Sequence, residues 1–217
     1  MNSKIKFAVV LAGSGVYDGS EIHEASLALY SISKNGGEYQ IFAPNINQHH
    51  VINHITGEEM PETRNVLVEA ARIARGNIKD LNEFSATDFD AILFPGGFGV
   101  AKNLCTFAFH GADCQVNHDV EIALKAMHKA KKPIGALCIA PALIARILGK
   151  VKVTIGQDKE TAEAITSLGA THVNTTHGEI VFDKENKIVT TPCYMLDATI
   201  AQIGEGAENV VKTIMAL

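Results

Sequence analysis

The stretch that decides the fold reads Pro133-Ile134-Gly135-Ala136-Leu137-Cys138-Ile139-Ala140-Pro141-Ala142. Its apolar first half predicts a short buried strand. The residues after the cysteine favour the first turn of a helix, where the missing N–H of Pro141 is no loss. Cys138 is therefore expected on a strand-to-helix turn at the edge of a sheet, where its small neighbours leave room for the turn.

A cysteine in this position has the surroundings of a nucleophile. The N–H groups of the following helix and the helix dipole favour a negatively charged sulfur. A thiol with an unperturbed pKa of about 8.5 is only about 3 % thiolate at neutral pH, whereas a pKa about two units lower makes it mostly thiolate. We therefore expect Cys138 to be an exposed, readily ionised nucleophile, and weigh this against the commoner fate of a free cysteine as a small buried hydrophobic residue.

Strand and helix signals alternate along the rest of the chain. Near-continuous apolar runs predict buried strands at residues 5–12, 39–43 and 90–94, with a further strand near 151–155 and a hairpin at 180–182 and 188–191. Helical spacing covers residues 22–32, 66–74, 120–130, 160–168 and a final helix from about 197, with Gly204 and Gly206 as candidate breaks. This alternation predicts an α/β fold with a doubly wound parallel sheet, in one domain over residues 1–217.

The composition of the chain narrows the class of protein. The 217 residues are 47 % hydrophobic and 20 % charged with a net charge of −5, and no basic block is present, which argues against nucleic acid as a partner. The longest apolar runs are too short to span a membrane. The first residues lead directly into a strand, so no targeting peptide is expected. Four cysteines make no disulfide framework at this length, and the expected compartment is the cytoplasm.

Unusual residues follow three of the predicted strands. Because functional sites of α/β sheets collect at the carboxyl ends of strands, these residues are expected to converge. The Cys138 turn is one of them. Pro95-Gly96-Gly97 is another: it is either a plain tight turn or, together with the N–H of Ile139, a set of backbone donors for an oxyanion.

The third strand end leads into Glu21 and Glu24, in the first turn of the next helix. The structural interpretation is dipole stabilisation with a capping box from Asp18 to Glu21. The functional interpretation places one carboxyl, Glu24 in preference to Glu21, beside the sulfur as an acid/base partner. Periodicity alone does not choose between them.

Three weaker patterns are interpreted as structural. Gly13-Ser14-Gly15 lacks the third glycine of a dinucleotide loop. Cys105, His110, Cys114 and His118 have scattered rather than paired spacing, so no metal site is expected. His177-Gly178-Glu179 has the composition of a base and its orienting group, but nothing in the sequence places it near Cys138.

The residues around the two glycines and the cysteine resemble the PfpI superfamily, whose members are flavodoxin-like α/β proteins related to class I glutamine amidotransferases. More narrowly, the chain is similar to the ElbB family. The stretches that carry this similarity are residues 15–24, 51–54, 62–66, 95–99 and 187–192. The resemblance extends over nearly the whole chain.

The resemblance implies a glutathione-independent, lyase-type glyoxalase that converts glyoxal to glycolate, or a related deglycase, with no cofactor or metal. It implies Cys138 as nucleophile, Glu24 as its acidic partner and Glu21 as the second choice. Gly96 and Gly97 match the oxyanion glycines, and Arg64 matches an arginine near the pocket of some relatives. A homodimer and an association with isoprenoid biosynthesis are also implied.

One departure from the superfamily pattern matters for the chemistry. Many members place histidine directly after the nucleophile, whereas this chain has Ile139. A Cys-His arrangement of adjacent residues is therefore not available, which argues against protease and amidotransferase chemistry and leaves any second base open. The alternative to an enzyme is a redox-responsive or regulatory binding protein, in which Cys138 is oxidised or only lines a ligand pocket. A nucleotide-binding module is the remaining alternative.

Overall fold

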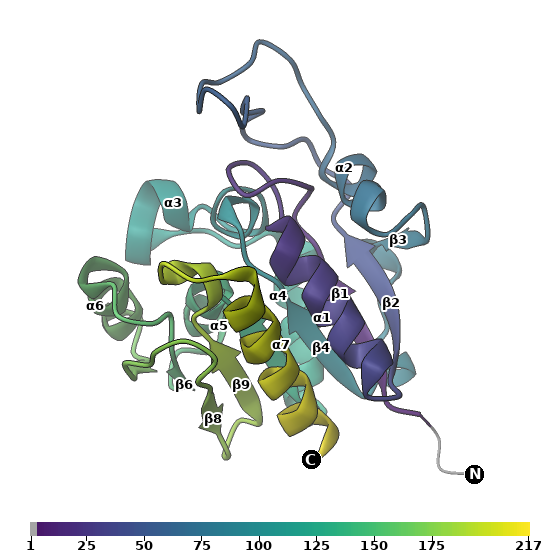
Figure 1. Ribbon diagram of the computed structural model, residues 1–217, viewed down its shortest axis with the longest axis vertical. Helices are drawn as coiled ribbons and strands as arrows, with labels where there is room; N and C mark the ends of the chain where they lie inside the picture. The colour runs from purple at the N-terminus through teal and green to yellow at the C-terminus, as the bar shows by residue number, and fades with distance from the viewer. Residues whose placement is uncertain (1–3) are drawn as a thin grey trace.

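The computed structural model describes residues 4–217 and is built around a seven-stranded sheet with helices on both faces (Figure 1). The strand order is β3-β2-β1-β4-β5-β9-β8, and every neighbouring pair is parallel except the hairpin of β8 and β9. The strands are β1 (Lys6–Val10), β2 (Glu38–Ala43), β3 (Ile78–Asp80), β4 (Ala91–Phe94), β5 (Ile134–Leu137), β8 (Val181–Asp183) and β9 (Ile188–Thr191). The predicted doubly wound sheet with a small antiparallel hairpin is confirmed.

Successive side chains of the central strands point to opposite faces of the sheet and pack into two separate hydrophobic cores. Phe7 and Val9 of β1 point into one of them, while Ala8 and Val10 point into the other. The first core is closed by α1 (Ile22–Lys34), α2 (Val66–Ile73) and α7 (Ile200–Met215). The second is closed by α4 (His118–Lys129), α5 (Ala140–Leu148) and α6 (Lys159–Ser167). Burial on both faces explains why these strands appear in the sequence as unbroken apolar runs.

The structure corrects several element predictions. The strand expected near 151–155 is only β6 (Lys152–Val153), and it pairs with β7 (Thr171–His172) in a second, two-stranded sheet rather than in the main one. Short elements without a clear period were missed: β3, the π-helix η3 (Val100–Leu104) and α3 (Phe107–His110). Single 3₁₀ turns also lie outside the predicted set: η1 (Leu81–Glu83), η2 (Ala86–Asp88), η4 (Gly111–Asp113) and η5 (Cys193–Met195).

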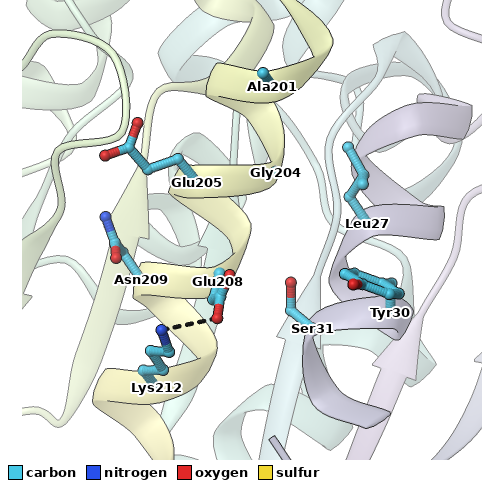
Figure 2. A pocket seen from close by; sticks show the side chains of 9 residues that line it. All are labelled: Leu27, Tyr30, Ser31, Ala201, Gly204, Glu205, Glu208, Asn209 and Lys212. Atoms are coloured by element: carbon cyan, nitrogen blue, oxygen red, sulfur yellow. Dashed lines mark ion pairs between the residues drawn. The ribbon is translucent and has the colours of Figure 1, made fainter. Parts of the chain in front are cut away.

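The final helix, α7, runs unbroken through Gly204 and Gly206, so the predicted break is wrong. Gly206 lies where the helix crosses β9, and a Cβ there would come within 2.8 Å of Thr191 Oγ1. Gly204 faces Leu27 of α1 across a shallow groove of about 380 Å³ (Figure 2). Gly206 therefore serves close packing, and burial of the apolar side of α7 against the sheet outweighs the low helix propensity of both glycines.

The segment between β2 and α2, residues 44–62, projects beyond the sheet at the top of Figure 1. It contains a bridge between Ile52 and Glu59, and most residues from 53 to 63 are exposed. Within residues 4–217, no helix combines the length and the apolar content that crossing a membrane requires.

Candidate active site

Cys138 lies on the predicted turn between β5 and α5. Its φ is +60°, a left-handed backbone conformation that residues other than glycine rarely adopt. The turn is held because Cys138 N–H donates to Thr191 O at 3.0 Å and α5 begins two residues later, at Ala140. Strain of this kind persists where the surrounding structure enforces it, and it concentrates at functional sites.

The loop after β4 brings Gly96 directly against this cysteine. A Cβ at position 96 would collide with the Cβ of Cys138 and lie 2.9 Å from its Sγ. The same hypothetical atom would lie 2.6 Å from Glu24 Oε2. The sulfur and the carboxyl oxygen therefore flank a single point, and only glycine fits between them.

Glu24 is completely buried and is held from two sides. Its Oε2 accepts from Gly96 N–H at 2.9 Å, and its Oε1 accepts from Tyr194 N–H at 3.2 Å. Burial, followed by the nearby charge of Glu21, raises the pKa of Glu24 to about 8. The carboxyl is therefore predominantly protonated at neutral pH, and it shares a hydrogen bond with the Cys138 thiol.

The thiol of Cys138 differs from the sequence expectation. The residue is only 7 % exposed, and its burial raises its pKa well above the ordinary value. The negative charge of an ionised Glu24 acts in the same direction, whereas the N–H groups of Gly97 and Ile139 oppose it. The prediction of an exposed, readily ionised thiolate is wrong, because the helix N-terminus that favours the anion is closed off from water.

Glu21 forms the N-cap of α1. Its Oε2 accepts from Glu24 N–H at 2.7 Å, and its own N–H donates to Gly96 O at 2.9 Å. The expected capping box from Asp18 to Glu21 is wrong, because Asp18 instead accepts from Ile52 N–H at 2.7 Å in the projecting segment. Glu21 thus positions both Glu24 and the glycine turn.

A cavity of about 670 Å³ opens onto the sulfur. Of the predicted site residues, Cys138, Gly97, Ile139 and Glu21 line it. Glu24 lies behind the sulfur, with no surface of its own exposed. The remaining wall is mainly apolar and includes Val16, Phe98, Phe107, Phe109 and Met195.

Arg64 lies elsewhere. Its guanidinium pairs with Glu62 at 2.7 Å and with Glu69 at 3.5 Å, at the start of α2. It is not among the residues of the described chain that line the cavity. The expectation of a pocket arginine came from the family resemblance, and the arginine's local acidic partners explain its different place.

Sequence reasoning missed Tyr194 and His23. Tyr194 lines the cavity, its N–H holds Glu24, and its hydroxyl hydrogen-bonds His23 Nδ1 at 2.8 Å. Tyr194 follows β9, the strand next to β5, so its position after a strand end was the available signal. That signal was obscured because residues 188–191 were interpreted only as half of a hairpin.

The weaker sequence patterns lie apart from Cys138 and Glu24. Among residues 4–217, no three His, Cys, Asp or Glu side chains are close enough together to hold a metal ion. His177 Nε2 hydrogen-bonds Asp197 O at 2.9 Å, and Glu179 accepts from Thr176 N–H. Both residues line a different hollow, beside α7.

Comparison with known proteins gives close relatives, although no family model matches the chain. The human glutamine amidotransferase-like class 1 domain-containing protein 3, mitochondrial, is 50 % identical over 98 % of this chain and 83 % of its own length. The rat ES1 protein homolog, mitochondrial, is 49 % identical over 99 % of this chain and 84 % of its own. A crystal structure of an isoprenoid biosynthesis protein with amidotransferase-like domain from Ehrlichia chaffeensis is 36 % identical, with a TM-score of 0.92 over 98 % of both chains.

More distant structures share the fold alone. Glyoxalase III from Candida albicans has a TM-score of 0.63 at 15 % identity, over 98 % of this chain and 96 % of its own. A ThiJ/PfpI domain protein from Brachyspira murdochii gives 0.62 at 14 % identity. The overall fold is thus found in proteins whose sequences have diverged widely.

The expected cytoplasmic compartment is contradicted. The human, rat and zebrafish relatives, which match 97–99 % of this chain, are all named mitochondrial. The prediction rested on the lack of a disulfide framework. That pattern indicates a reducing compartment, but it does not distinguish one reducing compartment from another.

Identity of 36 to 50 % along almost the whole chain, with the same amidotransferase-like sheet around Cys138, shows that this protein belongs to the ElbB family of amidotransferase-like proteins with the ThiJ/PfpI fold.

Proposed function

We propose that the chain is a lyase-type glyoxalase that converts small α-oxoaldehydes such as glyoxal to 2-hydroxy acids such as glycolate through a hemithioacetal on Cys138. One observation carries the proposal: the Cys138 sulfur and the Glu24 carboxyl lie against the same side of Gly96 beside a largely apolar cavity, and burial raises the pKa of that carboxyl to about 8. A carboxyl held on the sulfur can exchange protons with the atoms that the sulfur binds. The Candida enzyme supports only the statement that this fold can host a glyoxalase.

The first step is addition of the sulfur to the aldehyde. The Cys138–Glu24 pair holds two protons at neutral pH and loses one of them near pH 8. In the singly ionised pair, the Glu24 carboxylate accepts from the Cys138 thiol, and it takes the thiol proton as the sulfur attacks. The sulfur forms a bond to the aldehyde carbon, and the carbonyl oxygen becomes an oxyanion that accepts from the N–H groups of Gly97 and Ile139.

The second step moves hydrogen between the two substrate carbons. The oxyanion takes the proton of Glu24, which leaves a carboxylate beside the new C–S bond. This carboxylate removes the proton from the carbon attached to sulfur, giving an enediolate, and returns it to the neighbouring carbon. The product is a thioester of Cys138 with a 2-hydroxy acid, and Glu24 is again a carboxylate.

Water completes the reaction. Glu24 takes a proton from the attacking water, and the tetrahedral oxyanion is held by the same two N–H groups. Collapse of this intermediate expels the Cys138 thiolate, which takes the proton of Glu24, so that the thiol and the carboxylate of the starting pair are restored. The net change is addition of one water to glyoxal, which gives glycolic acid.

The alternatives fit the site less well. An amidotransferase would need an imidazole on the sulfur, whereas Cys138 has a carboxyl as its proton partner and Ile139 beside it. A peroxide sensor at Cys138 would need a ready thiolate, whereas burial raises the pKa of this thiol.

The direct test is an assay of glycolate formation from glyoxal by wild type, Cys138→Ala and Cys193→Ala. Cys193 is a matched control, because its thiol is as deeply buried and lies nearby without lining the cavity. We expect Cys138→Ala to lose activity by at least about 10³-fold, while Cys193→Ala keeps it. Glycolate formation by Cys138→Ala at the wild-type rate would refute the proposal. Phenylglyoxal as a second substrate tests whether the apolar wall accepts a larger aldehyde.

A further inference from the structure

Cys105 and Cys114 form a second cysteine site, apart from Cys138. Cys105 pairs with Val116 in an antiparallel bridge, and Thr106 N–H donates to Gln115 O at 2.9 Å. Cys114 stands two residues before Val116, so its side chain lies on the same face as that of Cys105. The S–H of Cys105 donates to Val100 O at 3.3 Å, and its sulfur is also within hydrogen-bonding reach of the Cys114 sulfur.

The surroundings make the two thiols unequal. The hydrogen bond from Cys105, together with the guanidinium of Arg146, lowers the pKa of Cys114 to about 7. Arg146 also donates from Nε to Cys114 O at 2.7 Å, which fixes it beside this cysteine. The same thiol–thiol hydrogen bond, with burial, raises the pKa of Cys105. An anionic sulfur therefore lies next to a thiol that keeps its proton, which is the arrangement of an attacking and a resolving cysteine.

The segment between these cysteines forms one wall of the cavity at Cys138. Phe107, Ala108, Phe109 and Gly111 all line it. The segment consists of one helical turn, α3, and one 3₁₀ turn, η4, and neither buries any residue. Short elements with so little buried surface open locally at low free-energy cost, so opening of this segment can expose Cys114, which is fully buried when it is closed.

We propose that Cys105 and Cys114 are a peroxide-sensitive pair that forms a reversible disulfide across the cavity wall. The Cys114 thiolate attacks hydrogen peroxide, which forms a sulfenic acid and releases hydroxide. The Cys105 thiol then attacks that sulfur, so that an S–S bond forms and the sulfenic oxygen leaves as water with the thiol proton. Two thiols are oxidised by two electrons and one peroxide is reduced to two waters. A dithiol reductant reverses the reaction.

The disulfide has a structural consequence for the cavity. An S–S bond of about 2.05 Å is shorter than a hydrogen bond between two thiols, so oxidation draws together the two ends of residues 106–113. It also closes this segment into a covalent loop, which restricts its opening. The wall over Cys138 becomes less mobile in the oxidised protein.

Peroxide treatment of the full chain tests the chemistry without any assay of aldehyde turnover. We expect the intact mass to fall by two hydrogens and non-reducing peptide mapping to join Cys105 to Cys114. In Cys105→Ser the sulfenic acid of Cys114 persists and is trapped by dimedone, whereas Cys114→Ser leaves Cys105 unmodified. Arg146→Gln slows the oxidation several-fold, because the Cys114 thiolate loses the guanidinium that stabilises it while the hydrogen bond from Cys105 remains, and Arg146→Lys partly restores the rate.

The loss of mobility in the cavity wall is measured separately, by an experiment that does not depend on glyoxalase activity. Hydrogen exchange of residues 106–113 and alkylation of Cys138 by iodoacetamide are compared in reduced and peroxide-treated protein. We expect both to be several-fold slower after oxidation, with the rates recovered by dithiothreitol and unchanged by peroxide in Cys105→Ser. Oxidation of Cys138 before Cys114, a disulfide rate unaffected by Arg146→Gln, or equal exchange in the two states would each overturn the proposal.

Discussion

The Glu24 carboxyl hydrogen-bonds the Cys138 thiol from a position with no exposed surface of its own. The two side chains come from opposite halves of the chain, α1 and the turn after β5, and Gly96 packs against both of them. Because this carboxyl has no exposed surface, it can exchange protons with water only by way of the Cys138 sulfur and the cavity. Its protonation is therefore tied to the state of the cysteine.

Removing the carboxyl tests this relationship. We expect Glu24→Gln to lower kcat/KM for glyoxal by about 10²–10⁴-fold, because the amide can donate a hydrogen bond but cannot carry a proton. Glu38→Gln, at an exposed position at the start of β2, is the control and should match wild type. Steady-state kinetics decide the matter, and full activity of Glu24→Gln would remove Glu24 from the mechanism.

The pH profile of the reaction follows from the raised pKa of Glu24. The productive form of the pair has lost one proton, so kcat/KM is expected to rise with pH, with its midpoint near pH 8, and to level off above that. Because the charge of Glu21 contributes to that raised value, Glu21→Gln should move the rise to lower pH. A profile that is flat from pH 6 to 9, or unmoved in Glu21→Gln, speaks against this assignment.

The same titration predicts how stability depends on pH. Between its ordinary value of 4.5 and about 8, the folded state binds a proton at Glu24 that the unfolded state has released. The contribution of Glu24 to stability is thus largest below pH 4.5, declines as pH rises toward 8 and is constant above that. Glu24→Gln lacks this titration. Thermal unfolding from pH 5 to 9 should show the Tm of wild type falling relative to that of Glu24→Gln, and parallel curves would contradict the burial described above.

Gly96→Ala places a methyl group between the sulfur and the carboxyl. The added Cβ would lie 2.6 Å from Glu24 Oε2 and 2.9 Å from Cys138 Sγ, so it must push the pair apart. We expect a loss of at least about 10²-fold in kcat/KM, comparable to the loss of a catalytic proton donor. Circular dichroism verifies that the fold is intact, and near-normal activity in a folded variant would mean that the contact is dispensable.

The two glycines of α7 should respond in opposite directions. At Gly204 a Cβ meets only Leu27, at 3.7 Å, so Gly204→Ala should raise the free energy of unfolding by about 0.5–1 kcal/mol. At Gly206 a Cβ would lie 2.8 Å from Thr191 Oγ1, so Gly206→Ala should lower it by about 1–3 kcal/mol. Urea denaturation of both variants measures the difference, and equal effects would contradict the packing of α7 on β9.

Much of the fold could be predicted from the sequence because its central strands are buried on both faces. The apolar runs that became β1, β4 and β5 have no competing period, and the turn at Cys138 is marked by proline and small residues. β3 and α3 were missed because three or four residues are too few to establish a period. The break expected in α7 was wrong because the glycine at position 206 allows close packing on Thr191, which is distant in the sequence, and does not end the helix.

The candidate site was only partly predictable, for a similar reason. Strand ends correctly brought together Cys138, Glu24 and Gly96, because the topology of a parallel sheet forces them to one edge. The ionisation of the thiol could not be foreseen, since it depends on how far the surrounding loops exclude water. Tyr194 and the distant place of Arg64 depend likewise on loop conformation. The homodimer implied by the family resemblance stays a prediction.

The central claim is that glyoxal passes through a covalent bond to Cys138. Acid quenching of wild type during the first turnovers, followed by peptide mass mapping, tests it most directly. We predict an adduct with the mass of one glyoxal on the peptide that contains Cys138, which appears early and decays as glycolate forms. Glycolate that accumulates while Cys138 stays unmodified at every time point would contradict the account.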